Sequence, residues 1–474
     1  MNRTENQELA TDISLEAESY IERIKRLATT NKNLKERFCE LADRFAAIQE
    51  QNLNYQKLLL KFSPESEMNK NKGSKKSARR LRMVSILYVG VSGFDKLYEV
   101  EDPTRMVDLL DEIKHRVEDI TFKHNILPIR TLGDTTIYAA GLQTESRTNV
   151  IDIMQIAMEI RNLANIIKKE KPWSIWSLNL AVHTGSVLAI PEKEDHPTFS
   201  FSGENLSTCF RLGESSDGTG IVTSAMTYEL IKDFFEGEKV GLLPAKYVGN
   251  LNVYNVENWL PEFKDSKNPF LPNHDFIIKY GHIKYIDLEE EMLDFLEHNL
   301  PKNLYYHNVK HTIDVVTEVE LIGWAEGVSE EELLILKIAA LFHDAGHAID
   351  YNNHEYHSTV MAREKMASYD FPQEYIDQVC KLIMATKLPP HPTNILEKIM
   401  CDSDLDYLGR TDFLPISNNL YEELKERNLV DSLNAWNKRQ LKFIKNHQYF
   451  TKTAKKLREV NKQKQIDRLR KIIF

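Results

Sequence analysis

The sequence predicts a multidomain protein in three parts: an N-terminal parallel coiled coil, a central α/β domain and a C-terminal all-α domain. Three observations point to this architecture. A heptad repeat runs from residue 20 to residue 62, β-rich runs alternate with helical runs between residues 83 and 259, and spaced histidines and aspartates on helical patterns follow residue 285. A chain of 474 residues is too long for one hydrophobic core, so several domains are expected.

The heptad repeat predicts a dimerising helix over residues 1–62. Apolar residues recur at alternating steps of four and three between Tyr20 and Phe62, as in a coiled-coil seam. Asn31 and Asn52 fall at the same heptad position, where a buried asparagine typically fixes the register of a parallel dimer. A single long helix folded against another domain is the alternative. Residues 63–80 are rich in lysine and arginine and read as a solvated basic linker.

The central segment, residues 81–260, reads as an α/β domain. Residues 84–89 and 135–140 have the composition of buried strands, and the second follows a Gly133-Asp134 turn. Residues 104–123 and 149–170 have helical patterns, and residues 176–183 supply a further strand. This alternation predicts helices packed on a sheet.

The C-terminal part carries the residues that point to a metal site. His307 and His311 are four residues apart, and on a helix this spacing places both imidazoles on one face, about 6 Å apart. His343 and Asp344 end an apolar run, and Asp404 lies far along the chain, as expected when separate helices each project one ligand inward. Nitrogen and oxygen ligands without cysteine favour zinc, manganese, iron or magnesium. A lone histidine is more often structural, but this combination indicates one or two divalent cations.

These residues resemble the HD-domain superfamily of metal-dependent phosphohydrolases, named for its His-Asp doublet. The segment from Tyr306 to Val315 also resembles the opening signature of the cyclic nucleotide phosphodiesterases. The resemblance covers roughly residues 285–460. It implies that the principal metal is bound by four residues, His311, His343, Asp344 and Asp404.

The same resemblance implies roles for other residues. His307 is expected to protonate the leaving 3′ oxygen, and Asp344 is expected to bridge to a second metal. His347 matches a position near the bridging hydroxide, and His354 and His391 resemble the extra histidines that bind a second metal in other HD proteins, so all three are candidate metal ligands. His357 and Asp402 read as solvated or supporting residues.

The substrate is less well defined by the sequence. Cyclic nucleotide phosphodiesterases carry a purine-binding glutamine and an aromatic clamp late in the domain. Gln440 with Phe443 are the candidates here, and Gln448 with Phe450 are the alternative pair. Because neither pair aligns firmly, other HD substrates, including nucleoside phosphates, alarmones and cyclic dinucleotides, remain open.

The central domain resembles the class III nucleotidyl cyclase catalytic domain over nearly its full length. The resemblance rests on four segments, residues 86–94, 130–134, 182–185 and 203–212. It implies a site with two metal-binding carboxylates, an asparagine and an arginine. Asp134 matches the second carboxylate and Arg211 the arginine, but Gly90 replaces the first carboxylate and Ser207 the asparagine. Since glycine cannot bind a cation, we expect a pseudocyclase.

The composition restricts the location and the partners. The net charge of −10 argues against a general nucleic-acid-binding surface, which usually needs a basic excess. The four cysteines show no paired spacing, which suits a reducing compartment. No run approaches about 18 apolar residues, and the N-terminus lacks the apolar segment of a signal peptide. We therefore expect a cytoplasmic protein with neither a nucleic-acid nor a membrane partner.

These expectations combine into one hypothesis. A coiled coil and a pseudocyclase domain, joined by a connector at residues 261–284, regulate an HD phosphohydrolase at residues 285–474 within a homodimer. The expected reaction is hydrolysis of a cyclic 3′,5′-nucleotide to the 5′-monophosphate, with a small molecule as regulator. Two alternatives are a cyclase in which Asp95 or Asp134 recruits metal atypically, and a pair of ligand sensors without turnover.

Overall fold

The computed structural model describes residues 79–99, 102–126, 128–142, 146–191, 199–245 and 249–473. The predicted coiled coil at residues 1–62 lies outside these residues. So does the basic linker at residues 63–80, except for Arg79 and Arg80, which begin the first strand.

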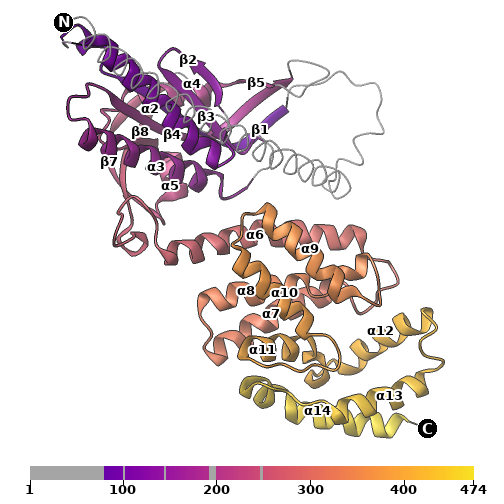
Figure 1. Cartoon of the computed structure of the whole chain (residues 1–474). Coiled ribbons are helices and arrows are strands. Elements are labelled where there is room, and N and C mark those ends of the chain that lie inside the picture. The colour runs from indigo at the N-terminus through magenta and orange to yellow at the C-terminus, as the bar shows by residue number, and fades with distance from the viewer. Residues whose placement is uncertain are drawn as a thin grey trace, which may run out of the picture. The chain divides into compact units, whose positions relative to one another are not determined.

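An α/β domain comes first in the described chain (Figure 1). Its strands are β1 (Arg79–Ser92), β2 (Pro128–Leu132), β3 (Thr135–Ala140), β4 (Ser177–Pro191), β5 (Phe199–Ser202), β6 (Ile221–Ser224), β7 (Phe235–Ala245) and β8 (Gly249–Trp259). Its helices are η2 (Phe94–Glu99), α2 (Pro103–Lys123), α3 (Asn149–Glu170), α4 (Glu204–Glu214), α5 (Ala225–Ile231) and η3 (Pro261–Phe263). The predicted helices at 104–123 and 149–170 and the predicted strand at 135–140 agree closely with α2, α3 and β3.

The strands form one mixed sheet. Its order is β2-β3-β1-β4-β6-β8-β7, and β5 pairs with β4 off this path. β4 and β6 are parallel, and the other pairs are antiparallel. Side chains of β1 alternate between the two faces, because successive residues of a strand point in opposite directions. Leu87, Val89 and Val91 pack with α2 and α3, whereas Ile86 and Tyr88 pack with α4.

The C-terminal part is entirely helical (Figure 1). Its elements are α6 (His274–Asn299), α7 (Val309–Glu326), α8 (Glu330–Phe342), η4 (Ala345–Ala348), α9 (His354–Ser368), α10 (Gln373–Ala385), α11 (Ile395–Asp404), η5 (Asp406–Gly409), α12 (Phe413–Glu426), α13 (Leu433–Asn446) and α14 (Lys452–Ile472). The all-α expectation for this region is confirmed.

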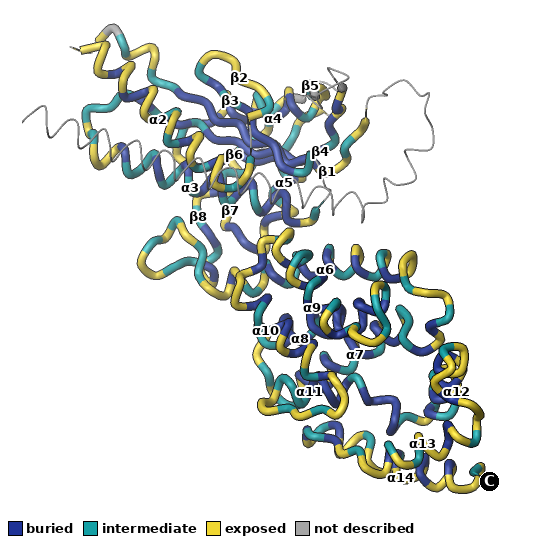
Figure 2. The backbone as a smooth tube through the Cα atoms, turned by 45° about the vertical axis from the view of Figure 1, so that its right-hand side comes forward, coloured by how far each residue is buried: buried dark blue, intermediate teal, exposed yellow. Residues whose placement is uncertain are grey.

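Helix α8 is the centre of the main helical core. It contacts α6, α7, α9, α10 and α11, and all of its apolar side chains from Leu333 to Phe342 are buried (Figure 2). A capping box fixes its start, since the Ser329 hydroxyl accepts from the Glu332 amide while the Glu332 carboxylate accepts from the Ser329 amide. Because the start of this buried helix is fixed, the residues that follow Phe342 lie at a defined, buried position.

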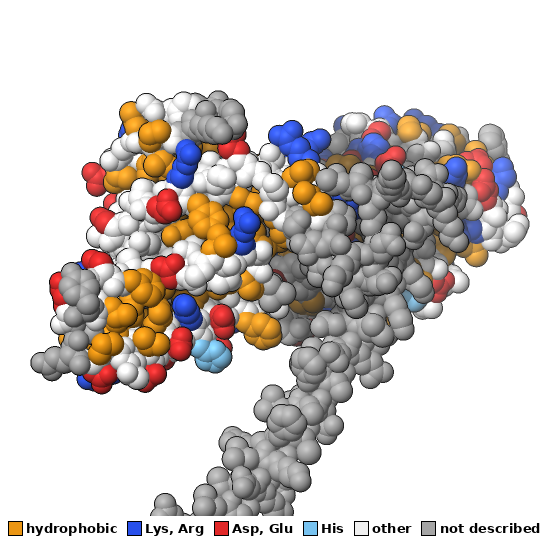
Figure 3. All heavy atoms as spheres, turned by 90° about the horizontal axis from the view of Figure 1, so that it is seen from above, with side chains coloured by type: hydrophobic (Ala, Val, Ile, Leu, Met, Phe, Trp, Pro, Cys, Tyr) orange, Lys and Arg blue, Asp and Glu red, His pale blue; other side chains and the backbone are white. Residues whose placement is uncertain are grey.

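In Figure 3, apolar side chains are scattered among acidic and basic ones. Such scattered apolar residues are normal for folded domains. Among the residues that the structure describes, no helix has the length and apolar character needed to cross a bilayer.

Candidate metal centre

Four of the predicted ligands meet where α8 ends. The Nε2 atom of His311 lies 3.3 Å from Nε2 of His343 and 3.3 Å from Oδ1 of Asp404. The Nε2 atom of His343 lies 3.3 Å from Oδ2 of Asp344 and 3.5 Å from Oδ1 of Asp404. Ligand atoms about 2.1 Å from one cation lie roughly 3.0–3.4 Å from each other, so this spacing fits a shared ion.

Local structure explains why these atoms face one another. The Nδ1–H of His343 donates to the carbonyl of Ala340 at 2.8 Å, which leaves Nε2 as the lone-pair nitrogen directed at the group. His311 sits in the first turn of α7, and Asp404 is the last residue of α11. Asp344 is 8% exposed, and its Oδ2 makes no hydrogen bond. A buried carboxylate oxygen without a donor is stabilised by a cation, so the residues fit a bound metal.

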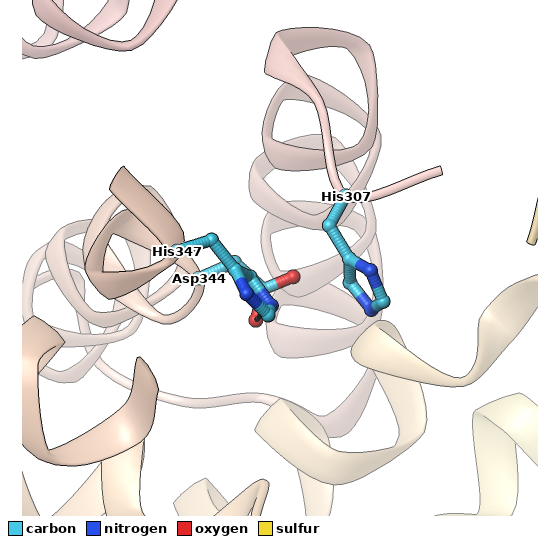
Figure 4. A group of neighbouring side chains, drawn as sticks. All are labelled: His307, Asp344 and His347. Atoms are coloured by element: carbon cyan, nitrogen blue, oxygen red, sulfur yellow. Dashed lines mark ion pairs between the residues drawn. The ribbon is translucent and has the colours of Figure 1, made fainter. Parts of the chain in front are cut away.

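A second group shares Asp344 with the first (Figure 4). His307, Asp344 and His347 each offer a ligand atom within 4.8 Å of the others. The Nε2 atom of His354 lies 3.5 Å from Oδ1 of Asp344, and its ring stacks on His347 at 4.0 Å. Burial lowers the pKa of His347 to about 3, so this imidazole is neutral at pH 7, the form that binds metals. Asp344 therefore presents one oxygen to each group.

His307 differs from the prediction in its backbone. The spacing from His311 predicted one helical face, but α7 begins at Val309, and Asn308 is its N-cap, with a side chain that accepts from the His311 amide. Asn308 therefore stops the helix before His307. The two rings are 6.0 Å apart, as the spacing predicted, but they are nearly perpendicular at 85°.

Glu423 is a site residue that the sequence analysis missed. Its carboxylate is fully buried on α12 and accepts from the amides of Tyr306 and His307, at 3.0 and 3.2 Å. It also pairs with Nδ1 of His307 at 2.5 Å and accepts from the Tyr351 hydroxyl at 3.0 Å. Burial alone would raise the pKa of Glu423, but the hydrogen bond and charge of His307 lower it to about 2. The same pairing overcomes the effect of burial on His307 and raises its pKa.

Glu355 was missed as well. It is 7% exposed in the first turn of α9, and its Oε1 lies 3.6 Å from Nε2 of His354. A single acidic residue on a helical pattern gives no sequence signal of its role. Glu423, for example, lies 116 positions from His307 in the sequence.

Four residues named in the sequence analysis are not in these groups. His391 is exposed and lines a separate groove of about 930 Å³ formed with α9 and α10. Gln440 is 3% exposed and donates to the Tyr407 hydroxyl at 3.5 Å, and Phe443 packs in the small core of α12 to α14. Asp402 accepts from the amides of Phe450 and Thr451, so it anchors the start of α14.

A smaller pocket of about 230 Å³ adjoins the first group. His311 and Asp404 form part of its wall, together with Tyr306 and Tyr407. Concave sites next to reactive groups, lined by aromatic rings and a few polar atoms, are typical of small-molecule binding. The pocket gives room for part of a substrate beside the metal centre.

The residues that the sequence analysis matched to cyclase chemistry lie on β1, on α4 and in the turn before β3. Gly90 on β1 pairs with Thr135 on β3, next to the turn that carries Asp134. Ser207 and Arg211 lie on α4 with exposed side chains, and Arg211 donates to the carbonyl of Pro244 at 2.9 Å. The ring of Tyr88 fills the space above Gly90, because a Cβ added there would lie 2.5 Å from the Tyr88 hydroxyl oxygen.

Comparisons with known proteins separate the two parts in the same way. Residues 77–258 match the model of the adenylate and guanylate cyclase catalytic domain, and residues 308–409 match the HD domain. The receptor-type guanylate cyclase gcy-10 of Caenorhabditis elegans is 22% identical over 41% of this chain and 18% of its own length. The soluble guanylate cyclase subunit alpha-1 of Rattus norvegicus is 24% identical over 33% of this chain and 22% of its own. The chain thus spans about a fifth of the length of these curated relatives.

Among solved structures, the adenylyl cyclase CyaB from P. aeruginosa is similar, with 16% identity and a TM-score of 0.36, over 39% of this chain and 98% of that chain. The sheet and helices at residues 79–259 together with the His and Asp groups at the end of α8 agree with the two family matches. The chain therefore joins a segment similar to the adenylate and guanylate cyclase catalytic domain, at residues 77–258, to a segment that matches the HD domain, at residues 308–409, and HD domains are typical of metal-dependent phosphohydrolases.

Proposed function

We propose that the HD domain is a phosphodiesterase that hydrolyses a cyclic 3′,5′-nucleotide to the 5′-monophosphate. The observation that carries this proposal is the pair of His307 and Glu423, placed beside two ligand groups that share Asp344. A buried carboxylate that accepts from Nδ1–H and stabilises the protonated imidazole leaves Nε2–H as a proton donor. Cleavage of a phosphodiester requires such a donor, because the departing alkoxide is a strong base.

We propose that two divalent cations bind at this site. His311, His343, Asp344 and Asp404 would hold the first, and Asp344, His347 and His354 would hold the second. When bound, the cations supply an activated water and neutralise charge on the phosphate. His307 gives its Nε2 proton to the 3′ oxygen as the P–O3′ bond breaks and the new P–O bond forms. Glu423 keeps His307 oriented and protonated before this step.

A substrate screen tests the proposed function. The full chain is incubated with Mn²⁺, Mg²⁺, Zn²⁺ or Fe²⁺ and with cyclic mononucleotides, cyclic dinucleotides and alarmones, and the products are separated by chromatography. We expect conversion of a cyclic 3′,5′-nucleotide to the 5′-monophosphate by the wild type and none by Asp344→Ala. If only a cyclic dinucleotide or an alarmone were hydrolysed, the proposed substrate would be wrong, but the proposed phosphoester hydrolysis would stand. No hydrolysis of any compound by a metal-loaded chain would favour the ligand-sensor alternative.

The cyclase-like domain is proposed as a regulatory pseudocyclase that pairs with a second copy and binds a small ligand. Tyr88 explains why its first metal position is lost. The ring is 6% exposed and lies between two glycines, since an added Cβ would approach Tyr88 to 2.5 Å from Gly90 and to 2.1 Å from Gly213. Its hydroxyl is also within 3.3 Å of the Thr135 hydroxyl. A carboxylate at position 90 has no space while this ring is in place.

Substituting Gly90 tests this arrangement. Gly90→Ala should destabilise the domain by about 1–3 kcal/mol through overpacking against Tyr88, seen as a lower unfolding midpoint. Gly241→Ala is the matched control, because nothing lies within 4 Å of a Cβ added there. Gly90→Asp should yield no cyclic product from GTP or ATP with Mn²⁺. Cyclic product from the wild type that Asp134→Ala removes would instead support the cyclase alternative.

A further inference from the structure

Arg427 is a cation without a counterion in the described part of the chain. It caps the C-terminal end of α12, and no hydrogen bond or ion pair is found for its guanidinium among residues 79–473 that the structure describes. Its Nε is buried and has no acceptor. Leaving a buried donor of a charged group unpaired costs free energy, and such groups usually mark a missing water or ion.

The guanidinium lies one aromatic ring away from the metal centre. Its central carbon is 3.8 Å from the centroid of the Tyr351 ring. That ring lies 5.0 Å from the ring of His347 and 6.1 Å from the ring of His307, and its hydroxyl donates to Glu423. Tyr351 therefore links Arg427 to both the proposed general acid and the proposed second metal group.

Three other cationic side chains of the helical domain already pair with carboxylates. Arg410 binds both oxygens of Asp412 and one oxygen of Asp314. Arg458 pairs with Asp406 and donates to Glu318. Lys310 pairs with Asp314. These cations are neutralised by carboxylates, whereas the charge of Arg427 is free to meet an anion from solution.

The positive charge proposed for the metal centre favours binding of an anion beside it. If divalent cations bind here, the carboxylates of Asp344, Asp404 and Glu423 offset only part of their positive charge, so the centre still attracts an anion. A phosphodiester arrives as an anion, gains negative charge as water adds, and leaves as a phosphate monoester with still more charge. An arginine presents several N–H donors in one plane, which match the non-bridging oxygens of a phosphate.

We propose that Arg427 binds the phosphate of the nucleotide, both in the diester substrate and in the 5′-monophosphate product. This inference rests on the proposed phosphodiesterase function and names the residue that holds the substrate anion. Tyr351 keeps the guanidinium at the edge of the centre through its ring face.

Kinetics of Arg427→Ala test the proposal. A hydrogen bond to a charged group typically contributes 1.5–3 kcal/mol, so KM for the cyclic nucleotide should rise about 10- to 150-fold. Product inhibition by the 5′-monophosphate should weaken by a similar factor, while bound metal stays constant. Methylguanidinium added to Arg427→Ala should restore part of the lost affinity. Arg363→Ala is the matched control, because Arg363 is already paired with Asp377 on the outer surface of α9.

Two results would overturn the proposal. One is a KM and a product inhibition constant within twofold of wild type. The other is a weaker enzyme that methylguanidinium does not restore and whose unfolding midpoint is lowered, since this shows that Arg427 only packs on Tyr351. If the wild type hydrolyses no cyclic nucleotide, the proposed function fails separately. Calorimetric titration of the metal-loaded chain with guanosine and adenosine 5′-monophosphate then decides on Arg427, because only a phosphate-binding role predicts weaker binding in Arg427→Ala.

Discussion

Asp344→Ala should abolish hydrolysis and remove bound metal. Asp344 has one oxygen 3.3 Å from Nε2 of His343 and the other 3.5 Å from Nε2 of His354, so its loss opens both ligand groups at once. We expect the rate to fall by at least about 10³-fold, because both the binding of the cations and their placement against the phosphate depend on this carboxylate. Metal content is measured by plasma mass spectrometry and turnover by product chromatography on the same preparation.

The matched control for this change is Asp350→Asn. Asp350 is a partly exposed acid six positions along, which accepts from the Asn352 amide and from the Asn353 side chain. It should keep both metal and rate. Full metal content in Asp344→Ala would show that the two groups do not share this residue, even if the rate were lost. Full rate with depleted metal would overturn the metal-dependent mechanism itself.

The resemblance to HD domains implied the ligand set, and local patterns in the sequence indicated where some of these ligands lie. His343 and Asp344 follow an apolar run that can only be a buried helix, so their burial is a direct consequence of where α8 ends. Asp404 lies beside them because it is the final residue of α11, a helix that packs on α7 and α8. Residues of this kind are visible without knowledge of the fold.

Residues that act through distant contacts were not predicted. Glu423 reaches His307 across 116 positions, and nothing in its neighbourhood differs from that of a surface acid. Gln440 shows the reverse error, since a glutamine with an aromatic residue on one helical face resembled a base-binding pair but is buried against Tyr407. The basic segment at residues 452–471 has the composition of a solvated helix. The helix is present as α14, but Ile466 and Leu469 are buried in the core with α12 and α13.

His307→Ala should slow turnover of the cyclic nucleotide by about 10²- to 10⁴-fold while the metal content stays constant. The expected defect is in the chemical step, because His307 is proposed to supply the proton for the 3′ oxygen, while the other residues of the two groups are proposed to hold the cations. Bis(4-nitrophenyl) phosphate distinguishes this role, since 4-nitrophenolate leaves without a proton. His307→Ala should therefore retain most of its activity on that compound.

Glu423→Gln should produce a milder form of the same defect and change its pH dependence. The negative charge of Glu423 raises the pKa of His307, so the protonated acid persists to higher pH in the wild type. Activity that needs protonated His307 is lost as the pH rises through this pKa. Without the charge, the pKa falls and the loss must begin at lower pH. Glu426→Gln, one turn away and bonded to the Tyr305 hydroxyl, should leave the profile unchanged.

The two His307 measurements also decide between its possible positions in the mechanism. His307 lies close enough to Asp344 and His347 to act as a ligand of the second group. A ligand role predicts that His307→Ala loses metal and slows both compounds equally, with no difference between the cyclic nucleotide and the nitrophenyl ester. A general-acid role predicts that His307→Ala keeps its metal and slows the cyclic nucleotide much more than the nitrophenyl ester. The bond from Nδ1 to Glu423 favours the acid, because a buried carboxylate that keeps the imidazole protonated weakens it as a metal ligand.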